Sequence, residues 1–153
     1  MLFRSSVVGL PGIAHVRAGV NVSDRADQWE HNYRCPDVAV FQNTGAARNL
    51  GTHWVGGPDF AIEIISPRDK SRDKLEFYAT VGVHELLLID RDPWSLILYE
   101  SQNGALVVVG QSEPPTSARL ESKIVPLAWR LLPGGARPTI EVTYLHSGQK
   151  WLV

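Results

Sequence analysis

The sequence of 153 residues predicts an α+β domain in which one helix flanks a mixed β-sheet. At least seven short segments are rich in apolar or β-branched residues and end at turn residues, which is typical of strands. One charged segment over residues 71–81 carries apolar side chains on one helical face, which predicts a helix. The order strand, helix, strand across residues 60–89 predicts a right-handed crossover between parallel neighbours.

The N-terminal part of the chain predicts two strands separated by a loop. Residues 14–22 alternate between apolar and polar side chains, which indicates a half-buried strand. Residues 23–32 are polar and predict a loop, with a short helix capped by Ser23 as the alternative. A proline-opened strand follows over residues 36–41, and the glycines of residues 42–57 predict another loop.

The central segment predicts a buried strand followed by the helix. Residues 60–65 are all apolar except Glu63, and Gly-Pro precedes them while Ser-Pro follows them. A continuous apolar run with such boundaries predicts a strand buried on both faces. The helix over residues 71–81 then ends at Gly82, which is a common residue at a helix C-terminus.

The C-terminal part predicts strands paired as antiparallel hairpins. Residues 85–90 form another continuous apolar strand, and residues 94–100 return after a turn that contains Pro93. Asn103-Gly104 is a strong turn signal before a strand at 105–110. The remaining apolar segments, which we expect to form strands at the edge of the fold, are 123–132, 139–145 and 148–153.

Length and composition narrow the class of protein. The chain fits one domain over residues 1–153, and its 44% hydrophobic content supplies one core. The formal net charge of -1 does not predict binding of nucleic acid through an overall positive charge, although a local basic face is still compatible with the sequence. The single cysteine excludes an intrachain disulfide. No apolar stretch has the length of a membrane helix or a signal peptide, so we expect a cytoplasmic protein.

Two acids and a lysine form the candidate site. An ionised carboxylate at Glu63 is costly within an apolar strand unless a cation compensates it. Asp37 is a second acid at the start of a strand, and Lys74 lies early in the following helix. Carboxylates from adjacent strands can bind Mg²⁺, and a nearby lysine can orient water or stabilise phosphate charge. The alternatives are a Glu63–Lys74 ion pair without metal and a turn-capping role for Asp37.

The residues around these acids resemble a known family. Cys35-Pro36-Asp37-Val38-Ala39-Val40-Phe41, followed by the segment 58–67, is similar to the Uma-two family of restriction-endonuclease-like proteins. The resemblance continues through Asp73-Lys74, Tyr78 and residues 82–85, and covers roughly residues 34–100. That family is placed in the PD-(D/E)XK nuclease superfamily. The resemblance therefore implies a restriction-endonuclease-like mixed sheet and a DNA phosphodiesterase that depends on Mg²⁺ or Mn²⁺.

The family pattern transfers residue by residue. Asp37 and Glu63 match the metal-binding acids, and Lys74 matches a catalytic lysine that has moved to the helix. The usual lysine position of the superfamily, two residues after the acid, holds Ile65 here. Lys70 is the weaker substitute because it precedes the helix. The family usually carries an N-terminal helical region, which we do not expect in this chain.

Two functions of different classes follow from these observations. The first is a metal-dependent endonuclease that uses Asp37, Glu63 and Lys74. The second is a catalytically inactive nuclease-fold domain that binds nucleic acid or protein, which Ile65 and the near-neutral charge favour. We also expect a homodimer, because so few helices cover the sheet that one of its faces or edges would be exposed to solvent without a partner. Residues without an assigned function are read as structural: Cys35, Asp59, Tyr78 and Asp90 at core or turn positions, and His31, His53 and His84 at surface or turn positions.

Overall fold

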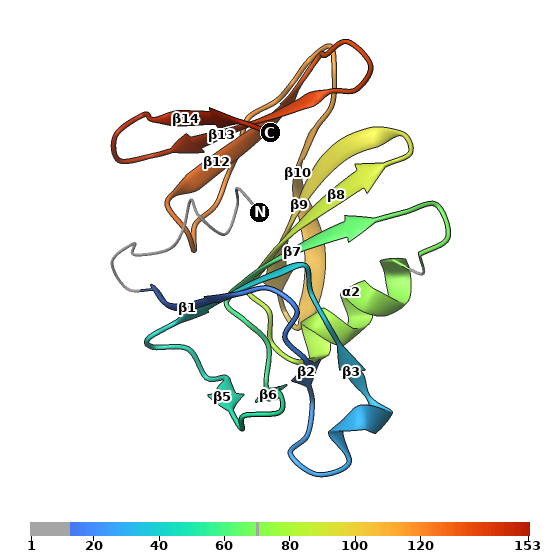
Figure 1. The fold of residues 1–153 in the computed structure, drawn as a ribbon, viewed down its shortest axis with the longest axis vertical. Helices are drawn as coiled ribbons and strands as arrows, with labels where there is room; N and C mark the ends of the chain where they lie inside the picture. The colour runs from blue at the N-terminus through green and yellow to red at the C-terminus, as the bar shows by residue number, and fades with distance from the viewer. Residues whose placement is uncertain (1–12, 70) are drawn as a thin grey trace.

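The computed structural model describes residues 13–69 and 71–153 as three sheets and one α-helix (Figure 1). The largest sheet has six strands in the order β1-β4-β7-β8-β9-β10. Its strands are β1 (Ile13–Arg17), β4 (Val38–Gln42), β7 (Phe60–Ile65), β8 (Glu85–Arg91), β9 (Trp94–Gln102) and β10 (Ala105–Ser112). Strands β7 and β8 are parallel and all other neighbours are antiparallel, so the sheet is mixed as predicted.

Two smaller sheets flank this central sheet. The C-terminal sheet contains β11 (Leu120–Glu121), β12 (Leu127–Leu132), β13 (Thr139–Tyr144) and β14 (Lys150–Leu152). The other contains only two-residue strands, in the order β3 (Tyr33–Arg34), β2 (Val22–Ser23), β6 (Trp54–Val55) and β5 (Arg48–Asn49). Figure 1 shows the C-terminal sheet on one side of the central sheet, with helix α2 (Ser71–Thr80) on the other.

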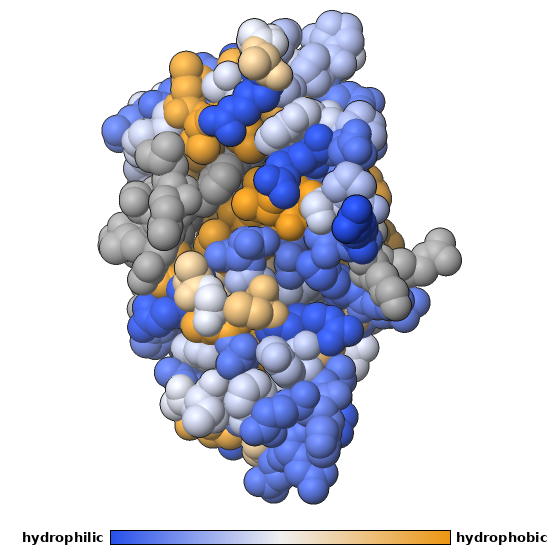
Figure 2. All heavy atoms as spheres, turned by 45° about the vertical axis from the view of Figure 1, so that its right-hand side comes forward, coloured by the Kyte–Doolittle hydropathy of each residue, from blue (hydrophilic) through white to orange (hydrophobic). Residues whose placement is uncertain are grey.

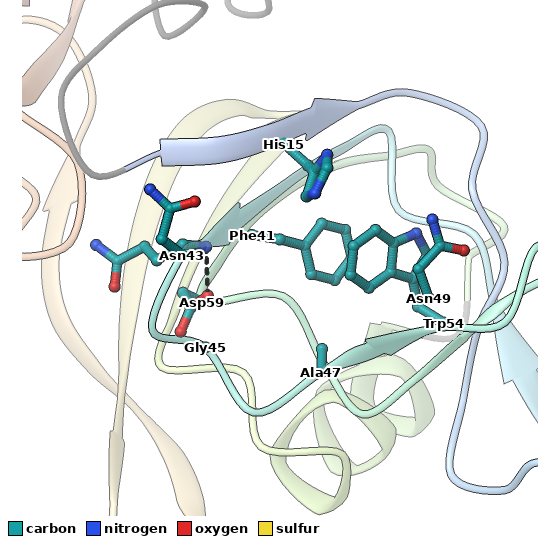
Figure 3. Close-up of a pocket in the computed structure, with 9 residues that line it drawn as sticks. His15, Phe41, Asn43, Gly45, Ala47, Asn49, Trp54 and Asp59 are labelled. Atoms are coloured by element: carbon teal, nitrogen blue, oxygen red, sulfur yellow. Dashed lines mark hydrogen bonds between the residues drawn. The ribbon is translucent and has the colours of Figure 1, made fainter.

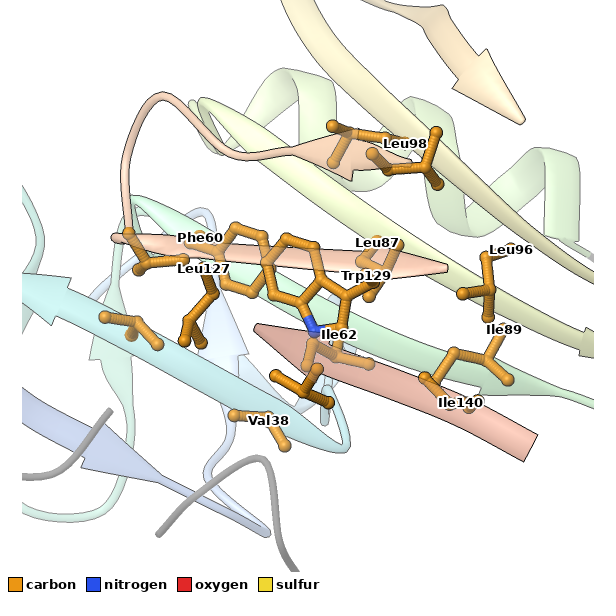
Figure 4. Packing of buried hydrophobic residues seen from close by; sticks show 14 of the residues in the cluster. Val38, Phe60, Ile62, Leu87, Ile89, Leu96, Leu98, Leu127, Trp129 and Ile140 are labelled. Atoms are coloured by element: carbon orange, nitrogen blue, oxygen red, sulfur yellow. The ribbon is translucent and has the colours of Figure 1, made fainter. Parts of the chain in front are cut away.

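The alternation of side chains along β7 builds one core on each face of the central sheet. Phe60 and Ile62 pack against the C-terminal sheet, where Phe60 stacks on Trp129 with ring centroids 5.4 Å apart (Figure 4). Ala61 belongs to the second core, together with Phe77 and Tyr78 of α2. Every residue of β7 except Ile64 is buried, so the prediction of a strand covered on both faces holds for its first four residues and Ile65.

Most predicted elements are confirmed within one to four residues. Strand β7 has the predicted bounds, and α2 covers the predicted helix apart from its last residue. The β9–β10 hairpin turns at Asn103 and Gly104, whose φ angles of 52° and 80° are both positive, as a tight two-residue hairpin turn requires. The predicted strand at 123–132 is shorter and begins at Leu127.

The N-terminal predictions need correction. The alternating segment 14–22 is not one strand, because β1 ends at Arg17 and Gly19, with φ of +68°, turns the chain toward β2. Ser23 caps no helix, since it lies in β2 and a short 3₁₀ helix, η1 (Trp29–His31), has Gln28 as its N-cap. His53 is not a surface residue, because its side chain is buried against Trp29.

The surface reflects this layered arrangement. On the face drawn in Figure 2, hydrophilic side chains cover most of the lower half, and apolar side chains reach the surface mainly in the upper half. Val108 and Val109 are exposed on β10, an edge strand of the central sheet. The expected homodimer stays a prediction. Among the described residues, no helix is both long and apolar enough to cross a membrane.

A buried carboxylate joins the central sheet to the C-terminal sheet. Glu85 begins β8, and its side chain accepts hydrogen bonds from the Ser122 hydroxyl and from the Lys123 backbone N–H at 2.8 Å. Burial raises the pKa of the Glu85 carboxyl above its ordinary value, although the two donors act in the opposite direction. The unfolded chain therefore ionises at Glu85 before the folded protein does.

This shift predicts a pH-dependent effect of Glu85→Gln on stability. The folded-state pKa is raised, so the contribution of Glu85 is fully present below about pH 4.5 and is lost as pH rises through the folded-state value. We expect the free energy of unfolding of the wild type, minus that of the variant, to decrease from pH 4 to pH 8, as measured by urea denaturation. A difference that stays constant or increases with pH would contradict this assignment.

Candidate active site

Glu63 occupies the middle of the candidate site. It lies in β7 on the face that α2 covers, and only 3% of its surface is exposed. The Tyr78 hydroxyl donates a hydrogen bond to Glu63 Oε1, and Lys74 Nζ lies 3.4 Å from Glu63 Oε2. Each carboxylate oxygen therefore has a donor from α2, which compensates part of the cost of burying the charge.

The helix positions both donors through its own periodicity. Lys74 and Tyr78 are four residues apart, so they lie on the same face of α2, one turn from each other. The turn after Pro67 is closed by Asp69, whose carboxylate accepts the Ser66 backbone N–H at 3.0 Å. The helix that follows this turn places Lys74 and Tyr78 beside Glu63 of β7.

The electrostatic environment of Glu63 contains opposing effects. Burial is the largest effect and raises the pKa of the Glu63 carboxyl. The hydrogen bond from Tyr78 and the charge of Lys74 lower this pKa, and the negative charge of Asp37 raises it. Burial and the adjacent Glu63 charge also raise the pKa of the Tyr78 phenol, so Tyr78 stays a hydrogen-bond donor.

Asp37 reaches β7 from the neighbouring strand, since it directly precedes β4. The β4–β7 pairing ends at Val38 and Ile62, and the Asp37 side chain then accepts the Ile64 backbone N–H at 2.8 Å. Asp37 therefore contacts the residue that follows Glu63. Burial, and after it the charges of Glu63 and Asp37, raise the pKa of the neighbouring Cys35 thiol. The structure thus brings Asp37, Glu63 and Lys74 together around the C-terminal half of β7.

Lys74 also has a second acidic neighbour. Its Nζ lies 3.7 Å from Asp69 Oδ1, and a quarter of its side chain is exposed. The Ser66 backbone N–H holds the pKa of Asp69 below its ordinary value, and the charge of Lys74 acts in the same direction. Ile65, which occupies the usual lysine position two residues after Glu63, has a buried apolar side chain. Lys70, the alternative lysine, lies outside the described residues.

The donor set suits a hard divalent cation that keeps part of its water shell. Within residues 13–69 and 71–153, no three His, Cys, Asp or Glu side chains are close enough to hold a metal ion by themselves. Asp37 and Glu63 offer two carboxylates, and Mg²⁺ is commonly bound by one or two carboxylates with water and substrate phosphates. Glu63 and Asp69 both lie within 4 Å of Lys74, and Asp37 adds a further negative charge near Glu63, so the acids outnumber the lysine and leave negative charge for a cation to balance.

The hydrogen bond of Tyr78 has no counterpart in the sequence predictions. The sequence predicts Tyr78 as a core contact, which is correct for its ring, but its hydroxyl also donates a hydrogen bond to Glu63. The signal that could have found this role is the four-residue spacing from Lys74, since both side chains then face one buried acid.

Asp59 lies at a bend just before β7, in agreement with its prediction as a turn residue, and its side chain makes further contacts. It is buried, accepts the Gln42 backbone N–H at 2.8 Å and lies 3.3 Å from His84 Nδ1. Asp59 lines a cleft of about 290 Å³ beside Phe41 and Trp54, which Figure 3 shows. This cleft lies at the N-terminal end of β7, and its lining contains none of Asp37, Glu63 and Lys74.

Asp90 accepts the Asp92 N–H at 2.9 Å, as predicted for the β8–β9 turn.

Comparison with known proteins places this geometry in a family context. The sequence model of the Uma2 family, described as "Putative restriction endonuclease", matches residues 9–132. A solved structure described as a "putative nuclease belonging to DUF820" from Anabaena variabilis aligns with a TM-score of 0.54 and 22% identity. The match covers 77% of this chain and 64% of that chain, so this chain spans less than two thirds of the length of that protein. No curated protein matches the chain significantly.

The structural match supports the fold predicted from the sequence. At this level of identity the likeness concerns the fold alone, and the α+β arrangement of mixed sheets with one helix is restriction-endonuclease-like. This outcome agrees with the resemblance carried by residues 34–100 of the sequence.

The Tyr78–Glu63 contact predicts a specific stability effect. Tyr78→Phe removes the donor and leaves a buried carboxylate oxygen unpaired, so we expect the free energy of unfolding to decrease by about 1–3 kcal/mol at neutral pH. Chemical denaturation measures this change. Tyr99→Phe on β9 is the matched control, with an expected change within about 0.5 kcal/mol. Equal effects of the two substitutions would show that the Tyr78 hydroxyl has no special role.

Proposed function

The chain belongs to the Uma2 family, described as "Putative restriction endonuclease", and we propose that it hydrolyses phosphodiester bonds of DNA with a divalent metal ion held by Asp37 and Glu63. One observation carries this proposal: a buried glutamate, a lysine 3.4 Å from it and a second acid lie around the C-terminal half of β7. A cluster of this kind, with the pKa of Glu63 raised by burial, is typical of functional sites.

Each residue has a distinct role in the proposed reaction. Asp37 and Glu63 would hold Mg²⁺ or Mn²⁺ through their carboxylate oxygens. A bound Mg²⁺ would supply charge stabilisation at the phosphate and lower the pKa of a coordinated water. Lys74 would hold the attacking water or neutralise charge that develops on the phosphate, because its side chain is partly exposed and its ammonium lies next to Glu63. Tyr78 would fix the orientation of the Glu63 carboxylate.

The alternative proposal is an inactive nuclease-fold domain. In that case Glu63, Lys74 and Tyr78 form a closed structural network, and the domain serves nucleic-acid or protein binding. Three features favour the active site over this alternative. The Lys74–Glu63 contact of 3.4 Å is long, Lys74 is shared with Asp69, and the acids outnumber the lysine. DNA as the substrate is supported by the description of the family.

Calorimetric titration with Mg²⁺ and with Mn²⁺ separates the two proposals. We expect one metal ion to bind per chain, with Asp37→Asn weakening the affinity by 10-fold or more because one of two carboxylate ligands is lost. The exposed acid Glu121 provides the control, since Glu121→Gln should leave the affinity unchanged. Absence of divalent-ion binding by the wild type would support the inactive domain.

Cleavage assays on plasmid and oligonucleotide DNA test the reaction itself. We expect Glu63→Ala and Lys74→Ala each to reduce metal-dependent cleavage by about 10²-fold or more, since each removes a group that acts on the transition state. Glu121→Ala should retain full activity. Full activity in Glu63→Ala would exclude this residue as a metal ligand.

A further inference from the structure

Three aromatic rings form a ladder that starts in the interior and ends at the surface. The His53 ring stacks on Trp29 with centroids 4.8 Å apart and an interplanar angle of 13°. Trp29 contacts the Tyr33 ring edge-on, with centroids 5.3 Å apart. The ladder ends at Tyr33, which is 40% exposed although it is a large aromatic residue.

The inner end of the ladder is fixed. His53 is 3% exposed, and its Nδ1 lies 2.9 Å from Thr52 Oγ1 while its Nε2 lies 3.0 Å from the Arg25 carbonyl oxygen. Both ring nitrogens therefore have partners, which fix the orientation of the imidazole that stacks on Trp29. The Ser23 hydroxyl donates to the Asn32 carbonyl oxygen at 2.7 Å, which anchors the turn just before Tyr33.

The exposed end of the ladder lies close to the candidate active site along the chain. Tyr33 precedes Asp37 by four residues, a separation of at most about 14 Å for an extended chain. Between them, Arg34 holds its guanidinium 5.1 Å from the centroid of the Phe77 ring on α2. Phe77 in turn contacts Tyr78, the hydrogen-bond partner of Glu63. A continuous set of contacts therefore connects the ladder to the acid.

We propose that Tyr33 is a stacking platform for an unpaired base of single-stranded DNA, within about four nucleotides of the phosphate that is cleaved. The inference rests on the proposed nuclease function and names the form of DNA that the site takes. A rigid exposed ring binds a base at low entropic cost, because it is already ordered before binding. Arg34, whose guanidinium donates to the Tyr33 carbonyl oxygen at 2.7 Å, adds a positive charge next to this platform.

The overall charge favours an unpaired strand over a duplex. Binding of duplex DNA depends strongly on neutralising many phosphates, and the chain has a net charge of -1. Stacking on an aromatic ring needs fewer cations, since every base offers a π-face once it is unpaired. Single exposed tyrosines are common on protein surfaces. Tyr33 differs because two further rings, one of them buried, hold it in place.

The test is a binding measurement without divalent metal, so that cleavage does not enter. Fluorescence anisotropy compares a 12-nucleotide single strand with a hairpin duplex of the same sequence; the chosen length lies within the range of roughly 4–16 nucleotides of known single-strand sites. We expect the wild type to bind the single strand more tightly. Tyr33→Ala should weaken this binding by roughly 5- to 100-fold, and Tyr33→Phe should retain it. The control is Tyr144→Ala, which removes a ring stacked on His146 in the C-terminal sheet and should change nothing.

Several results would overturn the proposal: duplex binding as tight as single-strand binding, or unchanged affinity in a folded Tyr33→Ala variant. If Tyr33→Ala does not fold, the wild type is tested with strands that carry one abasic site at each position in turn. Loss of affinity at one position supports stacking, and uniform affinity excludes it. A ribonucleotide strand that binds more tightly than DNA would overturn the assignment to DNA.

A failure of the stacking proposal can be distinguished from a failure of the proposed nuclease function. Tyr33-dependent binding without any metal-stimulated cleavage would contradict the nuclease proposal and leave the stacking platform intact. Cleavage that depends on Glu63 but is insensitive to Tyr33 and to strand pairing would support the nuclease proposal and contradict the stacking platform.

Discussion

The burial of the Glu63 carboxylate is the constraint on which the rest of the candidate site depends. An ionised group with 3% exposure in an apolar strand needs donors on every side, and the fold supplies them from α2. This need explains why α2, whose Phe77 and Tyr78 pack in the apolar core, also directs the Lys74 ammonium and the Tyr78 hydroxyl to the sheet. It also explains why raised pKa values gather here, at Glu63, Tyr78 and Cys35.

The position of Lys74 shows that a lysine can be placed beside Glu63 from the helix and not from the strand itself. Residues two apart on a strand point to the same face, so a lysine at position 65 would lie beside Glu63. Ile65 occupies that position and is buried, which contributes to the core and removes the strand as a source of a cation. The helix supplies it instead, because the turn after Pro67 brings α2 back over the C-terminal half of β7. The ammonium thus reaches Glu63 from the neighbouring layer.

The sequence predicts the parts of the fold whose patterns are long and regular. β7, β8 and α2 have continuous periodicity and clear boundary residues, and Glu63 and Lys74 of the site follow from β7 and α2. The sheet of two-residue strands was not predicted, since two residues carry no periodicity. The burial of His53 and Asp59 depends on contacts between distant segments, with Trp29 and His84 respectively. Such contacts leave no local signal.

The central claim is that Asp37 and Glu63 bind a divalent metal ion, and that Lys74 is not simply the permanent partner of Glu63. A crystal structure from Mn²⁺-soaked crystals tests it most directly, through the anomalous scattering of the metal. The claim predicts one anomalous peak between the two carboxylates, with Glu63 Oε2 turned from Lys74 toward the ion. Density without an anomalous peak, and with the Lys74–Glu63 contact unchanged, would contradict it.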